Sequence, residues 1–290
     1  MTYIQVAGLY FSFDQELEFL AESINYNPFV SSKYEKEEDF LFNLTIDTNL
    51  KHEKTNDKYI YWNEMGSYGV KVKNNQFQWV LKKADAEEYY LMDLDSAYKK
   101  ATLNFKITDN FTYQAANDFI RFAFIYTSAF HQTVILHASC IKNKDKGIAF
   151  MGRSGIGKST HSSLWLKFIA GSELLNDDQP AVRILNDMPI IFGTPWSGKT
   201  LCYKNLQVEL VAILCMDQQL YNKITRLPSV GLFTHLLSAC SLLRSEKSTL
   251  QHILKTLSKI AEKVRGGVLE NKPEEEAAQL AYNFLLTGNE

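Results

Sequence analysis

Gly152-Arg153-Ser154-Gly155-Ile156-Gly157-Lys158-Ser159 is the segment that decides the fold of this 290-residue chain. It matches the pattern Gly-x-x-x-x-Gly-Lys-Ser/Thr, in which glycines let successive backbone N–H groups face an anion. The apolar run 148–151 precedes the segment, and the run 160–170 has apolar positions suited to a buried helix face. This order predicts a strand, a phosphate-binding loop that ends at Thr160, and a helix whose N-terminus points at the phosphates.

The two residues that close this pattern have distinct chemical uses. Lys158 would neutralise the outer phosphates of a nucleotide, and the hydroxyl of Ser159 would ligate Mg²⁺. The loop therefore predicts a nucleoside triphosphate as ligand, and ATP and GTP fit the pattern equally well.

A second stretch, residues 193–200, also matches the pattern, with the sequence Gly-Thr-Pro-Trp-Ser-Gly-Lys-Thr. Pro195 has no N–H and Trp196 is bulky, so neither suits a cradle of backbone donors. The residues that follow it do not have a helical pattern. We therefore expect a polar loop of another kind near the site, and an ordinary turn is the alternative.

Two adjacent acids, Asp177 and Asp178, follow a short apolar strand about twenty residues after Lys158. In phosphoryl transfer, one carboxylate can hold Mg²⁺ and another can take the proton of the acceptor hydroxyl. An exposed Asp-Asp-x-Pro turn is the structural alternative. The phosphate-binding loop at this spacing favours the catalytic interpretation.

His137 is placed by the register of a predicted hairpin. If the run 132–141 pairs with the run 147–151, the partner of His137 lies within about two residues of Gly152. The imidazole then lies beside the phosphate loop, and a histidine satisfied on a sheet face is the alternative. A strand antiparallel to the strand of the loop also predicts a mixed sheet.

Composition divides the chain into two predicted parts. Residues 1–110 form a β-rich domain of short aromatic and β-branched runs, among them the loosely alternating run 4–13. Packing is the expected use of these aromatic residues. Residues 111–290 contain the loop, a helix at about 113–130, several strands, and about seventy final residues with helical patterns.

Charge and composition exclude several classes of protein. Lys and Arg total 31 against 33 Asp and Glu, so electrostatics do not favour nucleic acid or an anionic membrane as partner. No apolar run approaches the roughly 20 residues of a membrane span. The start of the chain has no basic region ahead of an apolar core, so we expect no secretory signal and a cytoplasmic protein. Scattered cysteines and histidines predict no zinc site.

Together, His137, the loop 152–160 and the pair Asp177-Asp178 resemble the catalytic domain of HPr serine kinase/phosphorylase. That domain is similar to the nucleotide-binding half of ATP-dependent phosphoenolpyruvate carboxykinase. The resemblance covers about residues 130–200. It implies an α/β fold, a P-loop kinase of this type with a mixed sheet, joined here to the β-rich domain and a helical tail.

The resemblance also implies roles for individual residues. The loop 152–160 binds the triphosphate of ATP, with Lys158 on its outer phosphates, and Ser159 and Asp178 hold Mg²⁺. Asp177 is the base that deprotonates a seryl hydroxyl, with His137 nearby; the two acids could exchange roles. Lys199 or Arg153 supplies a further positive charge.

Two features depart from that family. Residues 1–110 do not resemble the regulatory domain of HPr kinase, and its Asn/Arg-rich signature is missing after the acidic pair. HPr as acceptor, a hexamer and phosphorolysis therefore do not follow, although a homo-oligomer is compatible with the sequence. We expect Mg·ATP-dependent phosphoryl transfer to a hydroxyl, on a protein or peptide. A small-metabolite kinase or carboxykinase-like enzyme and a non-catalytic ATP-binding sensor are the alternatives.

Overall fold

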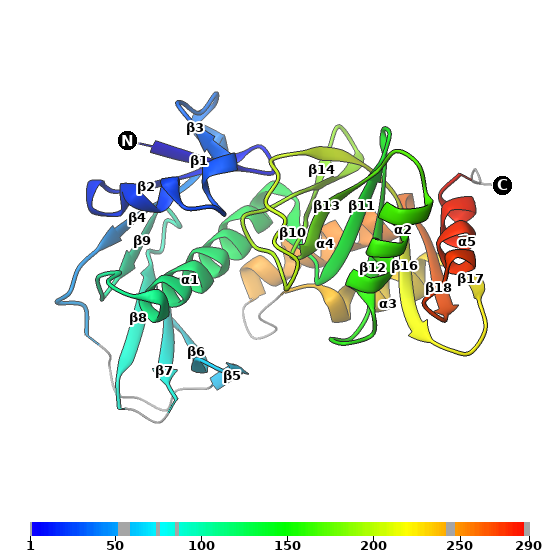
Figure 1. The fold of residues 1–290 in the computed structure, drawn as a ribbon. Helices are drawn as coiled ribbons and strands as arrows, with labels where there is room; N and C mark the ends of the chain where they lie inside the picture. Colours follow the sequence, from blue (N-terminus) through cyan, green and yellow to red (C-terminus); the bar gives the residue numbers. More distant parts are fainter. Residues whose placement is uncertain (1, 52–58, 74–75, 85–86, 242–246, 287–290) are drawn as a thin grey trace. The chain divides into compact units, whose positions relative to one another are not determined.

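The computed structural model describes residues 2–51, 59–73, 76–84, 87–241 and 247–286. Its contacts divide the chain into two compact units, Met1–Ser128 and Ala129–Glu290, each with its own sheet (Figure 1). The sequence suggested a boundary at residue 110. The contacts instead keep helix α1 (Asn110–Ser128) with the first unit, because it packs on strands β4 and β8 of that unit.

The first unit is built on a nine-stranded sheet in the order β3-β1-β2-β4-β9-β8-β7-β6-β5. Its strands are β1 Thr2–Val6, β2 Leu9–Phe13, β3 Val30–Ser31, β4 Phe40–Ile46, β5 Tyr59–Asn63, β6 Gly66–Lys73, β7 Gln76–Lys83, β8 Tyr89–Leu94 and β9 Lys100–Leu103. Short 3-10 helices lie at Gln15–Glu22, Asn27–Phe29 and Glu37–Asp39. The sheet is mixed, because β4 runs parallel to both β2 and β9 while the other pairs are antiparallel.

Aromatic side chains fill the core of this first unit. Phe11 stacks on Phe42 with ring centroids 5.2 Å apart, and Phe77 stacks on Trp79 at 5.1 Å. All of these rings are buried. The expectation that the aromatic residues serve packing is confirmed for this cluster, because buried stacked rings offer no exposed platform to a ligand.

The second unit contains another mixed sheet, in the order β10-β14-β15-β16-β12-β11-β13, with β18 also paired to β16 and β17 paired to β18. Its strands are β10 Thr133–Ile135, β11 Ala138–Asn143, β12 Lys146–Met151, β13 Ser172–Asp178, β14 Ala181–Leu185, β15 Met188–Phe192, β16 Gln207–Gln218, β17 Lys223–Leu227 and β18 Arg265–Asn271. Its helices are α2 Lys158–Phe168, α3 Ser229–Ala239, α4 Lys247–Lys263 and α5 Glu275–Leu286, with a 3-10 turn at Ala129–His131. The expected mixed sheet is confirmed, because β12 is antiparallel to β11 and parallel to β16.

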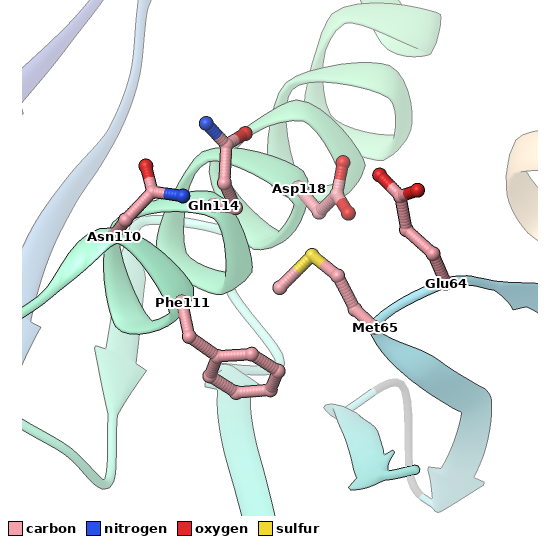
Figure 2. Close-up of a pocket in the computed structure, with 6 residues that line it drawn as sticks. All are labelled: Glu64, Met65, Asn110, Phe111, Gln114 and Asp118. Carbon is pink, nitrogen blue, oxygen red and sulfur yellow. The ribbon is translucent and has the colours of Figure 1, made fainter.

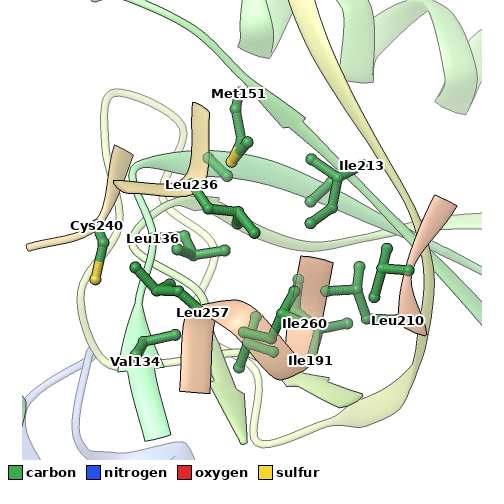
Figure 3. Packing of buried hydrophobic residues seen from close by; sticks show 14 of the residues in the cluster. Val134, Leu136, Met151, Ile191, Leu210, Ile213, Leu236, Cys240, Leu257 and Ile260 are labelled. Atoms are coloured by element: carbon green, nitrogen blue, oxygen red, sulfur yellow. The ribbon is translucent and has the colours of Figure 1, made fainter. Parts of the chain in front are cut away.

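Helices cover both faces of this second sheet. Side chains of α3 and α4 close one core, which includes Val134, Leu136, Met151, Ile191, Leu210, Ile213, Leu236, Cys240, Leu257 and Ile260 (Figure 3). Side chains of α2 and α5 close the other core, around Phe150 and Trp165. On β12, Met151 faces the first core and Phe150 the second, because successive side chains of a strand point to opposite faces. The apolar run before the glycine loop is therefore a strand buried on both sides.

Three sequence-based expectations are corrected by the fold. The run 4–13 is a hairpin of β1 and β2 that turns at Ala7 and Gly8, both with positive φ. The run 132–141 breaks into β10 and β11, which lie in different parts of the sheet because β10 pairs with β14. The final segment is not wholly helical, since β17 precedes α3 and β18 lies between α4 and α5. β18 was missed because its Gly-Gly pair has low strand propensity, which burial against β16 overrides.

None of the helices in the described ranges has the length and apolar character needed to cross a membrane.

Candidate active site

Strand register brings three distant segments to one edge of the second sheet. β11 lies between β12 and β13 and is antiparallel to both, so the carboxyl ends of β12 and β13 meet the amino end of β11. Ala138, the first residue of β11, pairs with both Met151 and Asp178. The glycine loop, His137 and the acidic pair therefore emerge together. The predicted placement of His137 near Gly152 is confirmed by this register.

The glycine loop, residues 152–157, joins β12 to α2 in a tight turn. The N–H of Ile156 donates to the carbonyl of Arg153 at 3.2 Å. Gly157 occupies the helix N-cap with φ 103°, a left-handed backbone that L side chains rarely adopt. Arg153, Ser154, Gly155, Ser159 and Thr160 are exposed. The backbone donors at the start of α2 thus lie at an accessible helix N-terminus.

Helix α2 is fixed to the sheet beneath this loop. Ser162 Oγ and Ser139 Oγ, both buried, are hydrogen-bonded at 2.7 Å, which joins α2 to β11. His161 is buried, packs edge-on against Phe150 and accepts a hydrogen bond from Trp165 Nε1 at 3.2 Å. Burial lowers the pKa of His161 to about 4. His161 is therefore a neutral packing residue, and it sets the helix against the sheet.

Lys158 folds back over its own loop. Its Nζ donates to the carbonyl of Gly152 at 3.0 Å and lies 3.4 Å from the carbonyl of Arg153. The side chain is buried, at 9% exposure. Burial lowers the pKa of Lys158, and the carboxylates of Asp178 and Asp177 oppose this shift because they favour the charged ammonium. Both acids thus act electrostatically on the loop lysine.

His137 connects Lys158 to the acidic pair. Its Nε2 lies 2.8 Å from Lys158 Nζ, and its Nδ1 lies 2.9 Å from Asp178 Oδ1. A protonated lysine can only donate, so Nε2 must accept; Nδ1 then carries the hydrogen and donates to Asp178. The result is a directed chain of hydrogen bonds from Lys158 through His137 to Asp178.

The two acids have different surroundings. Asp178 is partly exposed and contacts His137 and the Nε2 of Gln179, the latter at 3.2 Å from its Oδ2. Asp177 is buried, at 3% exposure, and its Oδ2 has no hydrogen-bond partner among the described residues. A buried carboxylate oxygen without a donor is costly unless a ligand completes it. This difference favours separate roles for the pair.

The second motif, residues 193–200, does not form a phosphate cradle. No helix follows it: the chain continues without regular structure until β16. It lies against the end of β13 instead. Ser197 forms an isolated antiparallel β-bridge with Asp178, and the N–H of Gly198 donates to the carbonyl of Asp177 at 2.5 Å. The expectation of a different loop beside the site is confirmed. Lys199, which follows directly, is exposed.

Sequence reasoning missed residues that complete this edge. Asn176 and Thr194 are fully buried and hydrogen-bonded to each other, and they join β13 to the second motif. Gln218 is the last residue of β16. Its side chain lies next to the glycine loop, because a Cβ on Gly157 would lie 3.8 Å from Gln218 Nε2. The sequence signal for the contact between Asn176 and Thr194 was the position of this asparagine directly before two acids at a strand end. Nothing in the sequence pointed to Gln218, because its position depends on the parallel pairing of β12 with β16.

A surface pocket of about 310 Å³ lies in the first unit, lined by Glu64, Met65, Asn110, Phe111, Gln114 and Asp118 (Figure 2). Four of these residues come from α1 and two from the turn before β6. The Asp118 carboxylate accepts from Tyr68 Oη at 2.7 Å and from Arg121 Nη2 at 2.9 Å. It therefore fixes α1 to β6, and the pocket shares no lining residue with the glycine loop or the acidic pair.

Comparison with known proteins found structural similarity over part of this chain. No family model and no curated protein matches the sequence. Among solved structures, the HPr(Ser) kinase/phosphatase from Coxiella burnetii is similar over 52% of this chain and 95% of that chain, with 13% identity and a TM-score of 0.33. At this level of similarity, the roles of the residues rest on the geometry of the site.

Proposed function

We propose that the second unit is a P-loop kinase that transfers the γ-phosphoryl group of Mg·ATP to a hydroxyl, on a serine of a protein or peptide. The observation that carries this proposal is the meeting of three groups at one sheet edge. These are the loop lysine Lys158, the hydrogen-bonded His137–Asp178 pair, and the buried Asp177 oxygen that lacks a donor among the described residues.

The glycine loop supplies the nucleotide site. Its exposed position before α2 offers backbone N–H groups and the positive end of the helix to the phosphates. On nucleotide binding, Lys158 would exchange the carbonyls of Gly152 and Arg153 for phosphate oxygens. Arg153 and Lys199, both exposed, are the further cations available at this edge.

The residues present fit a magnesium ion. The hydroxyl of Ser159 and the carboxylate of Asp178 form an all-oxygen donor set, which Mg²⁺ prefers, and Mg²⁺ commonly binds one or two protein ligands together with substrate phosphates. Bound there, it would neutralise charge on the β- and γ-phosphates. His137 Nδ1 lies 2.9 Å from Asp178 Oδ1 and holds this carboxylate in place.

Asp177 is the proposed general base. It accepts the proton of the acceptor hydroxyl as the new bond from that oxygen to the γ-phosphorus forms. The bond from the γ-phosphorus to the bridging oxygen breaks, and ADP leaves with the electron pair of that bond. A carboxylate oxygen without a competing donor among the described residues is free to accept this proton. Charge neutralisation and positioning would supply most of the rate enhancement.

The test is transfer of label from γ-labelled ATP with Mg²⁺ and a lysate of the source cell as a pool of acceptors. We expect label in a polypeptide, and a fall of at least about a hundredfold for Asp177→Asn, because loss of a general base has effects of that size. Label in a small molecule would favour the metabolite kinase. Tight ATP binding without transfer to any acceptor would favour the sensor.

Asp145→Asn is the matched control. Asp145 is an exposed acid in the turn between β11 and β12, so its amide variant loses the same charge away from the proposed site. It should transfer label as the wild type does. If Asp177→Asn also retained wild-type turnover, the assignment of the base would be wrong.

A further inference from the structure

The segment 193–206 covers the free edge of β13. β13 ends the order of the sheet, so its outer edge pairs with no strand in the described part of the chain. The segment runs along this edge from Ser197, which bridges Asp178, to Lys204, whose Nζ bonds Glu173 Oε1 at 2.8 Å. The N–H of Gly193 donates to the carbonyl of Leu206 at 3.0 Å and closes the loop. The loop is thus held at both of its ends.

Asn176 and Thr194 form the buried centre of this contact. Asn176 Nδ2 lies 3.0 Å from the carbonyl of Trp196 and 3.3 Å from Thr194 Oγ1, while its Oδ1 accepts from the N–H of Gln179 at 2.9 Å. Thr194 Oγ1 lies 2.8 Å from the carbonyl of Gln179. The residues on either side of the acidic pair are therefore both tied to the second motif.

The two glycines of the second motif permit close approach. A Cβ on Gly193 would lie 2.1 Å from the carbonyl oxygen of Lys204, and a Cβ on Gly198 would lie 2.8 Å from that of Asp177. Glycine is required at both positions because two backbone segments approach closely there. This packing explains the Gly-x-x-x-x-Gly spacing, and no role in phosphate binding is needed.

Asp178 needs such support. Its φ is 143°, a backbone conformation that L side chains rarely adopt and that persists only where the surroundings hold it. We propose that residues 193–200 are a brace for the acidic pair, with Thr194 and Asn176 as positioning residues that hold Asp177 and Asp178 in reactive geometry. This inference rests on the proposed function, and it predicts that loss of the brace slows transfer and leaves nucleotide binding intact.

Thr194→Val tests the brace, because it removes the hydroxyl and keeps the shape. We expect its kcat to fall by roughly tenfold or more, with KM for ATP within about twofold, as for an interaction needed mainly in the transition state. Thr194→Ser keeps the hydroxyl and should restore kcat to within about threefold of wild type. In the full-length protein, hydrogen exchange at the Gly198 amide should be fast in Thr194→Val and protected in Thr194→Ser.

Gly198→Ala is the second variant, in case Thr194→Val does not fold. Its Cβ would press on the carbonyl oxygen of Asp177 and on the Cβ of Asp178, and the same selective loss of kcat is expected. Wild-type kcat together with a protected Gly198 amide in Thr194→Val would overturn the brace. Equal losses in Thr194→Val and Thr194→Ser would overturn it too.

A wild-type protein that transfers no label would instead refute the proposed kinase activity. The Gly198 exchange comparison would then decide on the brace by itself: fast exchange in Thr194→Val supports it, and unchanged exchange rejects it.

Discussion

Lys158 is held by acceptors of its own loop and by His137. Its Nζ is within hydrogen-bond distance of two loop carbonyls and of His137 Nε2. A lysine already ordered at the loop loses less conformational entropy on binding phosphate than a mobile surface lysine would. His137 contacts both Lys158 and Asp178. One imidazole therefore positions the lysine proposed to bind phosphate and the carboxylate proposed to bind the metal.

The buried His161 predicts a pH-dependent stability. Its pKa is about 4 in the folded protein, below the ordinary 6.5, so the unfolded chain binds more protons between these values. The contribution of neutral His161 to the unfolding free energy is therefore present above about pH 6.5 and is lost as the pH falls towards 4. We expect the loss of unfolding free energy between pH 7.5 and pH 5 to be smaller in His161→Gln than in wild type by about 2 kcal/mol.

Urea unfolding at the two pH values measures this difference. His235→Gln is the matched control, because His235 is an exposed histidine on α3. It should lose as much stability on acidification as the wild type. An identical loss in His161→Gln would show that this imidazole does not couple folding to protonation.

At the scale of elements, two copies of one motif have different structural surroundings. The first follows a strand buried on both faces and begins a helix, so its backbone donors stay exposed. The second follows β15 and runs along the edge strand β13. Its backbone pairs with that strand, through the Ser197–Asp178 bridge and the hydrogen bond from Gly198 to Asp177. The flanking elements, and not the motif itself, decide whether a glycine loop offers its N–H groups to a ligand.

Alanine substitutions in the two motifs should therefore differ in cost. Gly155 has φ 80° and open space around a built Cβ, so Gly155→Ala should cost about 1 kcal/mol of unfolding free energy through backbone strain alone. Gly193→Ala should cost at least about 3 kcal/mol, because its Cβ would overlap backbone atoms of Lys204 and Leu175. Denaturant unfolding without nucleotide compares the two. Equal costs would contradict the close approach at Gly193.

At the scale of the whole molecule, the proposed site belongs to one of two units. Each unit has a separate mixed sheet and a separate core. The residues of the proposed site, from His137 to Lys199, all lie in the second unit. The first unit contributes a β-rich body with an aromatic core and the pocket at α1.

Ligand binding should stabilise the second unit measurably. On the proposed function, Mg·ATP at about a hundred times its Kd should raise the unfolding free energy by about 2.7 kcal/mol, because a ligand that binds only the folded state stabilises it. Hydrogen exchange of peptides from the second unit, with and without Mg·ATP, is the measurement. Lys158→Ala should lose the effect, and Lys167→Ala, an exposed lysine on the same helix, should retain it. Protection in both variants would refute the role of Lys158.

The sequence determined the parts of the proposed site that depend on neighbouring residues. The order strand, loop and helix around 152–160 and the hairpin register of His137 depend on local propensity and on the period of two along a strand. The acidic pair was found because it comes directly after a short apolar run, and the structure places it in the last two positions of β13. These features involve short sequence separations, so the chain encodes them locally.

Only the tertiary structure decided what depends on distant pairing. The break between β10 and β11, the insertion of β18 beside β16 and the contact of the second motif with β13 each join residues far apart in the chain. Their stability comes from burial and hydrogen bonds formed across the sheet, which no local pattern of residues specifies. For the same reason, the unusual backbone of Asp178 and its support by Thr194 and Asn176 emerged from the fold alone.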